Sequence, residues 1–407
     1  MTAPAATDAP APRAQEAWDA RQWSRLLVLS GNMLLDAIEV SVLLIALPTL
    51  AARFGLTPWS AQWLMSGFAL GFAALLLLGP VLCARIGRRR AYLGAMLLFA
   101  LASLAGGLAG GPALLVAVRV VKGCCAALTA PTGLAIINDL FPEGPQRRRA
   151  LSVYSLFGAA GFTAGLLLAG GLLATGWRWV FVFPAPVALA LLVAGAYVLP
   201  REQGGGPARL PSPALLKRGP LLRSALGAAC LNGTYQALLV VMVFQMADGF
   251  GWSPWRSALA LLPACVPLAL SVPFAGRLIA RHGSRRLVTL GALFPLLGHL
   301  LYLARPHSGY ALGMLPVQLL VEAGFCLAFV ALNTQATAGL DPAQRGAAVA
   351  LYQAFVQLGA ALLLPLVALL LTRATGPRPA LALVTAVGAL GLAAALVRRP
   401  APATTAG

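Results

Sequence analysis

The chain has 407 residues, of which 59% are hydrophobic and only 10% are charged, and its 30 basic and 11 acidic residues give a formal net charge of +19. Soluble domains carry about 25% charged residues, so this composition excludes a protein that covers itself with a water-facing surface. The positive charge does not indicate nucleic-acid binding, because the basic residues stand in short clusters between apolar runs and form no basic face. These features predict a polytopic α-helical membrane protein.

The first 24 residues form a polar segment rich in Ala and Pro, without the apolar core of a signal peptide. We therefore expect residues 1–24 to be a cytoplasmic N-terminal tail. The six cysteines lie within or at the ends of apolar runs and lack the CxxC or His spacing of a metal site. We expect them to pack helices, and we expect neither a metal site nor a cofactor.

Apolar runs long enough to cross a bilayer, which takes about 20 residues, recur along the chain. The longest interruption, residues 200–220, is rich in Gly and Pro and is expected to be a cytoplasmic linker. It separates two six-helix bundles, residues 25–199 and 221–397, and residues 398–407 form a C-terminal tail. The predicted fold is an all-α integral membrane protein with twelve transmembrane helices in two pseudo-symmetric six-helix bundles around a central cavity. The twelve runs cover roughly residues 25–50, 59–84, 91–109, 112–138, 150–175, 179–199, 221–246, 254–280, 286–304, 310–338, 346–372 and 379–397.

The distribution of Lys and Arg predicts the orientation of these helices. Basic residues concentrate in the two tails, the linker and every second loop, whereas the intervening loops hold few. Under the positive-inside rule both termini are then cytoplasmic. The strong preference for Arg over Lys, with abundant Ala, Gly and Pro, is typical of a high-GC bacterial genome. We therefore expect a multi-pass protein of the bacterial cytoplasmic membrane.

A basic hairpin motif occurs once in each predicted bundle. Residues 85–90 read RIGRRR after the second span, and residues 281–286 read RHGSRR after the eighth. The two copies lie close to half a chain length apart, which indicates a duplicated bundle. Two related bundles around a midplane site suit transport by alternating access.

Several stretches resemble signatures of one transporter family. Residues 80–90 read PVLCARIGRRR, residues 119–123 read RVVKG, residues 138–142 read NDLFP, residues 177–181 read WRWVF, and Glu39 precedes an Ala-Leu-Pro at residues 46–48. Over residues 25–397 the chain resembles the major facilitator superfamily, and in particular its drug:proton antiporter branch.

The resemblance implies a monomeric transporter that exchanges protons for drugs. The family's usual hairpin Asp is replaced by Ala84 and Ala280, and the fifth-span antiporter signature lacks its proline between Gly158 and Gly171. The direction of transport therefore stays open at this point. The resemblance also implies that the two hairpins gate the cavity through Arg85, Gly87, Arg88, Arg89, Arg281, Gly283 and Arg285.

Five charged residues are candidates for lying deep inside the membrane: Asp36, Glu39, Arg119, Lys122 and Glu322. Each costs about 2.5–3.5 kcal/mol at the bilayer centre, so pairing or a water-filled cavity is required. Counting 1.5 Å per residue places Glu39 level with Arg119 and Asp36 level with Lys122. We therefore predict a ladder of two ion pairs that acts as a proton switch, the alternative being a permanently paired structural network. We expect Glu322 to bind a cationic substrate or a proton. The alternative is that Glu322 makes a structural hydrogen bond.

Polar side chains within the apolar spans are candidates for lining a substrate cavity, although hydrogen bonds between helices explain many such residues. His299 is expected to be structural. The predicted cavity residues are Asn32, Asn232, Tyr235, Gln236, Asn333, Gln335, Tyr352, Gln353 and Gln357.

The function that these features favour is proton-coupled export of a small hydrophobic or amphipathic compound, such as a drug, an antibiotic or a natural product. One alternative is a proton-coupled symporter that imports a small solute. Another is a membrane enzyme or sensor on the same fold, although the sequence has no nucleophile–base pair. We do not expect ATP-driven transport, because the sequence has no phosphate-binding GxxxxGK[ST] loop. The expected partners are the small-molecule substrate, protons and membrane lipid, without nucleic acid.

Overall fold

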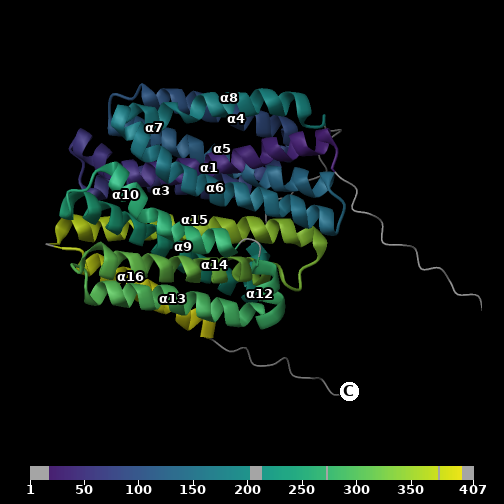
Figure 1. The fold of residues 1–407 in the computed structure, drawn as a ribbon. Coiled ribbons are helices and arrows are strands. Elements are labelled where there is room, and N and C mark those ends of the chain that lie inside the picture. The colour runs from purple at the N-terminus through teal and green to yellow at the C-terminus, as the bar shows by residue number, and fades with distance from the viewer. Residues whose placement is uncertain (1–17, 202–212, 272–273, 375, 397–407) are drawn as a thin grey trace, which may run out of the picture.

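A computed structural model of the chain describes residues 18–201, 213–271, 274–374 and 376–396. Most of the predicted N-terminal tail, the C-terminal tail and most of the linker lie outside the described residues. The described elements are all helical, which confirms the predicted fold class (Figure 1). Figure 1 shows α1 to α8 in its upper part and α9 to α16 below them.

The helices of the upper part are α1 (Ala20–Phe54), α2 (Pro58–Ala61), α3 (Trp63–Ile86), α4 (Arg88–Gly107), α5 (Pro112–Leu140), α6 (Pro145–Thr175), α7 (Arg178–Val182) and α8 (Pro184–Val198). Those of the lower part are η1 (Pro213–Lys217), α9 (Gly219–Phe244), η2 (Gln245–Gly249), α10 (Pro254–Leu261), η3 (Leu262–Ala264), α11 (Cys265–Ser271), α12 (Ala275–His282), α13 (Ser284–Ala304), η4 (Tyr310–Met314), α14 (Leu315–Thr337), α15 (Pro342–Arg373) and α16 (Arg378–Leu396).

Local sequence sets the ends of these helices. The Asp19 side chain accepts a hydrogen bond from the backbone N–H of Gln22, and the Gln22 side chain accepts one from the Asp19 N–H, which forms a capping box at the start of α1. The two predicted hairpins turn at Gly87 and Gly283, whose φ angles are +87° and +76°. Only glycine adopts such angles without strain, so the repeated motif forms the same kind of turn in both halves.

Among the described residues, eleven helices are long and apolar enough to cross a membrane. The eighth predicted span, residues 254–280, is not among these eleven helices. The segment is divided into α10, η3, α11 and α12. Pro263 and Pro267 lie within it, and each removes a backbone donor and clashes with the preceding turn, which breaks a helix.

A small cluster of Leu76, Ala127 and Ala354 joins α3 and α5 to α15, and the main apolar core that the two halves share lies at one end of the molecule. This core joins the C-terminal part of α1 to the C-terminal part of α9 and to α15, and includes Leu47, Met242 and Leu363. At the same end the backbone N–H of Trp59 donates a hydrogen bond of 3.1 Å to the Thr372 hydroxyl. The halves are therefore held against each other at this end.

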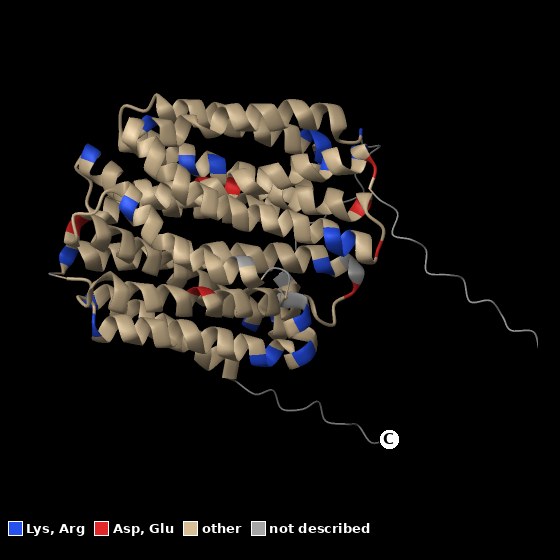
Figure 2. Ribbon diagram, viewed as in Figure 1, with Lys and Arg blue, Asp and Glu red and all other residues tan. Residues whose placement is uncertain are grey.

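At the opposite end each half has its own core. The upper core is built on α4, α5 and α6, and the lower core on α9, α13, α14 and α15. Lys and Arg gather at this end (Figure 2), where the two basic hairpins also lie. We call it the arginine-rich end. Large members of its two cores are Tyr92, Phe99 and Phe141 above, and Leu287, Leu332 and Tyr352 below.

Helices α3 and α5 pack with their backbones in contact, and this positions the charged face of α5. A Cβ atom on Gly123 would collide with the carbonyl oxygen of Phe68, and one on Gly71 with the carbonyl oxygen of Val120. We predict that Gly123→Val separates α3 from α5, because the colliding atoms belong to backbone and cannot turn aside. The expected loss is about 1–3 kcal/mol or more, visible as a lower yield of monodisperse protein by size-exclusion chromatography.

The matched control is Gly94→Val in α4, since a Cβ there meets no atom within 4 Å. Equal yields of the two variants would contradict the assignment of Gly123 to a backbone contact.

Candidate functional site

Helix α1 carries two of the buried acidic groups and is oriented by α6. Gly161 and Gly165 bring the backbone of α6 against α1 at Leu34 and Ile38, where any side chain would collide. With 3.6 residues per turn, Asp36 and Glu39 then lie roughly on the opposite face of α1. The glycines of the predicted fifth span therefore fix the direction in which α1 presents its acidic residues.

Glu39 forms ion pairs with both cations of α5. Its Oε2 lies 2.8 Å from Nη1 of Arg119, and its Oε1 lies 2.6 Å from Nζ of Lys122. The side chains of Glu39, Arg119 and Lys122 are 5%, 1% and 0% exposed. The Nε of Arg119 also donates a hydrogen bond of 3.0 Å to the carbonyl oxygen of Leu64. We call these three charged residues the buried triad.

Aromatic rings complete the surroundings of the two cations. The Arg119 guanidinium lies 4.5 Å from the centroid of the Phe68 ring, and the Lys122 ammonium lies 4.9 Å from that of Phe99. Such contacts stabilise a cation more strongly where water is excluded. The charged heads are thus enclosed by one carboxylate and by ring faces.

Of the two predicted ion pairs, the structure contains the first and not the second. Glu39 pairs with Arg119 as predicted, but Lys122 does not pair with Asp36. The side chain of lysine is long and flexible, so the Lys122 ammonium can reach Glu39, which lies about one helical turn away in depth, and it contacts Oε1. Asp36 instead accepts a hydrogen bond of 3.2 Å from Nδ2 of Asn32 and is only half-buried. Asp36 is therefore the acidic residue of α1 that keeps access to its surroundings.

In the lower half, α14 carries a second buried acidic group. Glu322 is 3% exposed, and its Oε2 accepts no hydrogen bond from the described residues. One turn earlier, Gln318 is also 3% exposed, and neither its amide oxygen nor its amide nitrogen has a partner in the described part of the chain. Buried polar groups are nearly always hydrogen-bonded, so buried polar atoms without a protein partner are expected to bind water or a ligand.

An aromatic column begins at Tyr235, whose hydroxyl interacts with Glu322. The ring centroids of Tyr235 and Phe325 are 4.7 Å apart, those of Phe325 and Phe329 are 5.1 Å apart, and those of Phe329 and Tyr352 are 6.2 Å apart. The column joins α9, α14 and α15 along the lower half. Together with Glu322 it combines an acidic group with flat apolar faces.

Several predicted cavity residues are instead engaged in hydrogen bonds between helices. Asn232 donates to the carbonyl oxygen of Val356 at 2.9 Å, which ties α9 to α15. The Tyr352 hydroxyl donates to the carbonyl oxygen of Phe329 at 3.3 Å, and Gln335 donates to the Ser284 hydroxyl at the same distance.

Other predicted cavity residues have free polar atoms or partly exposed side chains. Gln236 and Asn333 each have a buried side-chain oxygen without a partner among the described residues. Gln353 and Gln357 are half-buried on α15. His299 is fully buried, and neither of its ring nitrogens has a partner in the described part of the chain.

The sequence reasoning missed Gln318 and the aromatic partners Phe68 and Phe99. Gln318 stands four residues before Glu322, so helical spacing places both residues on one face of the helix. This spacing in the sequence could have identified Gln318. No comparable signal marks Phe68 or Phe99, because rings within an apolar run are usually ordinary packing residues.

The first hairpin is tied to the end of α5. Nη1 of Arg88 lies 2.7 Å from Oδ2 of Asp139, and both side chains are exposed. Arg89 donates to the carbonyl oxygen of Ala196 at 2.5 Å. Exposed ion pairs contribute little to stability, so the gating role of the hairpins remains a prediction.

Comparison with known proteins places this architecture in a family. The model of the Major Facilitator Superfamily matches residues 29–362 and 264–406. The chain is 33% identical to the puromycin resistance protein pur8 of Streptomyces alboniger, covering 88% of this chain and 83% of that protein. It is 30% identical to the cephamycin export protein CmcT of Amycolatopsis lactamdurans, covering 80% of each.

A solved structure of a bacterial homologue of the human lysosomal transporter Spinster, in an inward-facing and occupied conformation, has the same fold. Its TM-score is 0.76 at 17% sequence identity, over 93% of this chain and 97% of that one. The family model and the two relatives cover most of the chain, and their membership carries over to it. The chain is a multi-pass membrane transporter that belongs to the Major Facilitator Superfamily.

Proposed function

We propose that the protein exports a small hydrophobic or amphipathic compound in exchange for protons, by alternating access. The observation that carries this proposal is the buried triad beside a half-buried Asp36 in the upper half, facing away from the glycine seam of α6. The relatives described as an antibiotic resistance protein and an antibiotic export protein support the same direction of transport.

The charges of α1 and α5 suit a proton exchange. The buried triad carries a net charge of +1, because one carboxylate faces two cations. An ionised Asp36 makes the group neutral, and a protonated Asp36 leaves it positive. A cationic substrate and a proton therefore compete, since the site accepts one more positive charge when Asp36 is ionised. This competition is what antiport requires.

The driving force is sufficient for export. One proton crossing a potential of 100 mV gains about 2.3 kcal/mol, and each pH unit adds about 1.36 kcal/mol. With both termini cytoplasmic in a bacterial cytoplasmic membrane, the arginine-rich end faces the cytoplasm. The shared core then lies at the outer end, an arrangement that suits uptake of substrate from the cytoplasm.

We assign substrate recognition to the lower half. The aromatic column offers flat faces to an apolar body, and Glu322 with Gln318 offers polar partners to its head group. The class of compound that fits is amphipathic and carries a cationic or hydrogen-bonding group.

The proposed function is tested in proteoliposomes with a pH gradient and a pH-sensitive dye inside. Adding a lipophilic cation or an antibiotic should cause proton movement only in vesicles that contain the protein, with the compound moving in the opposite direction. Proton and compound moving in the same direction would instead show symport. Proton movement that no compound changes would contradict coupled transport.

Glu322→Gln should weaken binding of a lipophilic cation by roughly 10- to 150-fold while leaving a neutral compound little changed. The reason is the loss of a charge-assisted contact, worth about 1.5–3 kcal/mol. The measurement is a Kd from tryptophan-fluorescence quenching in detergent, for one cationic and one neutral compound of similar size. The control is Glu143→Gln, because Glu143 is exposed. An equal loss for both compounds would argue against a charge contact at Glu322.

A further inference from the structure

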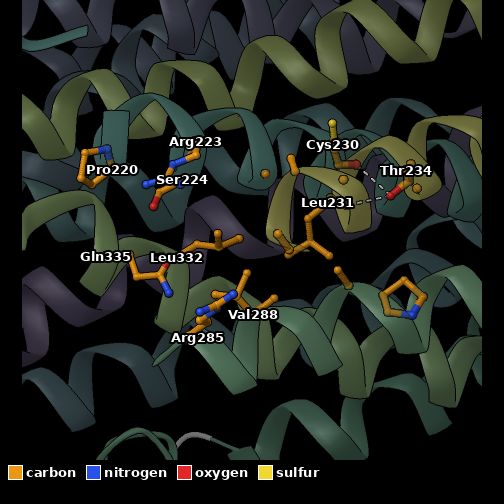
Figure 3. Close-up of a pocket in the computed structure, with 18 of the residues that line it drawn as sticks. Pro220, Arg223, Ser224, Cys230, Leu231, Thr234, Arg285, Val288, Leu332 and Gln335 are labelled. Carbon is orange, nitrogen blue, oxygen red and sulfur yellow. Dashed lines mark hydrogen bonds between the residues drawn. The ribbon is translucent and has the colours of Figure 1, made fainter. Parts of the chain in front are cut away.

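A pocket lies inside the lower half, away from the boundary between the halves. It has a volume of about 320 Å³, and all its lining residues come from α9, α13, α14 and α16 and the residue that follows α14. Figure 3 shows its walls. Ligand pockets in proteins have volumes of about 300–1,000 Å³, so the space is sufficient for part of a small molecule. Neither Glu322 nor the aromatic column lines it.

The pocket is polar at one end and apolar along the rest of its length. Arg223, Ser224, Arg285 and Gln335 lie toward the left in Figure 3, whereas Cys230 and Thr234 lie toward the right. On α9 the lining runs from Pro220 to Thr234, which corresponds to about 21 Å at 1.5 Å per residue. The remaining walls are mostly small or apolar side chains, including Gly227, Ala292, Gly388 and Gly391. The shape is a narrow apolar slot with a basic mouth.

The mouth holds two positive charges and no negative one. Among the described residues, no carboxylate lines the pocket, and neither Arg223 nor Arg285 forms an ion pair. Nε of Arg223 donates to the carbonyl oxygen of Gly219 at 3.2 Å. Arg285 follows the second basic hairpin's glycine and is exposed. Two guanidinium groups around one opening favour an anion between them.

The mouth lies near the ends of two long apolar helices, where basic side chains of membrane proteins meet lipid headgroups. Arg223 lies in the first turn or so of α9 and Arg285 at the start of α13, both at the arginine-rich end. Beyond them the slot extends into the apolar part of the helices. A ligand that fits must therefore carry an anionic head and a hydrocarbon chain.

We propose that this slot binds an anionic phospholipid, with its phosphate between Arg223 and Arg285 and one acyl chain between α9, α13 and α16. Guanidinium groups bind phosphate oxygens through paired N–H donors, and basic pockets between transmembrane helices are a recognised form of lipid site. The lipid then stabilises the packing of α9, α13, α14 and α16 in the lower half, and it does not enter the path between the halves. This site is independent of the direction of transport.

The test uses the full-length protein, purified in detergent and stripped of lipid, and native mass spectrometry. Three probes are titrated: phosphatidylglycerol, phosphatidylcholine with the same acyl chains, and glycerol phosphate. We expect phosphatidylglycerol to bind at least tenfold more tightly than phosphatidylcholine, and glycerol phosphate not to bind. Arg223→Ala with Arg285→Ala should remove that preference.

Arg286→Ala is the matched control, because Arg286 is the next residue on α13, is exposed and does not line the pocket. Gly391→Leu tests the slot itself, since a Cβ at Gly391 would already lie 3.2 Å from that of Cys230. It should weaken phosphatidylglycerol binding while leaving the unliganded melting temperature within a few degrees. If the double arginine variant does not fold, Arg285→Gln alone provides the comparison.

Three results would overturn the proposal. Equal binding of the two lipids by the native protein and by the arginine variants would show nonspecific lipid association. Binding of glycerol phosphate as tight as that of phosphatidylglycerol would show a site for free phosphate without a chain. Displacement of phosphatidylglycerol by a transported compound, prevented by Gly391→Leu, would make the slot a substrate site.

Discussion

Glu39→Gln is expected to leave most of the protein unfolded or aggregated. The substitution removes the negative charge that both Arg119 and Lys122 contact, and leaves two cations buried with no counter-charge. Breaking a buried ion pair by removing one partner costs about 3–5 kcal/mol, and native proteins have only about 5–15 kcal/mol of stability. The measurement is the melting temperature in detergent, followed with a thiol-reactive dye, together with the yield of monodisperse protein.

A triple variant separates the structural effect from the functional one. Glu39→Gln with Arg119→Met and Lys122→Met removes all three charges, and replacing a buried ion pair by neutral side chains is often neutral or stabilising. We expect this variant to recover much of the lost stability and still to move no protons. A Glu39→Gln variant as stable as the native protein would show that the buried triad does not hold α1 against α5.

Asp36→Asn should abolish proton movement while leaving the fold intact. Asp36 is half-buried and lies outside the buried triad, and asparagine can still accept the hydrogen bond from Asn32. The protein should therefore keep its melting temperature. Because an amide cannot take up a proton, compound-driven proton flux in proteoliposomes should fall at least tenfold, whereas exchange of labelled for unlabelled compound should continue.

The same variant predicts a change in pH dependence. In the native protein an ionised Asp36 favours a cationic compound and a protonated one opposes it, so affinity for the cation should rise with pH. In Asp36→Asn that rise should disappear. The control is Asp139→Asn, which removes an exposed acidic group of the same half. Proton flux that survives Asp36→Asn would move the proton site elsewhere, and Glu322 would be the next candidate.

Much of the architecture could be predicted from the sequence because lipid imposes strict rules. A spanning segment must satisfy its backbone polar groups internally, so long apolar runs predict helices. The rule is weaker where proline intervenes, as the division of residues 254–280 into α10, η3, α11 and α12 shows. Hydropathy measures how apolar a segment is. It does not show whether the backbone hydrogen bonds of a helix run without interruption through that segment.

The sequence was sufficient to predict which charged residues make up the candidate site. It was sufficient to predict only some of the contacts between them. Helical depth brought Glu39 level with Arg119, and the two are paired. Depth alone ignores the reach of a side chain, and for that reason the partner of Lys122 was wrong. The slot in the lower half could not be predicted, because its walls come from four helices that lie far apart in the chain.

The buried ion pairs of the described residues all lie in the upper half, and this asymmetry bears on how the protein can adapt to new compounds. The neighbours of Glu322 include the Tyr235 side chain and the Cys326 thiol, which can be exchanged without unbalancing any charge. Laboratory selection for resistance to an unfamiliar antibiotic is therefore expected to yield substitutions on α9 and α14. The residues of α1 and α5 to which we assign proton coupling are expected to stay the same in variants with different substrate specificities.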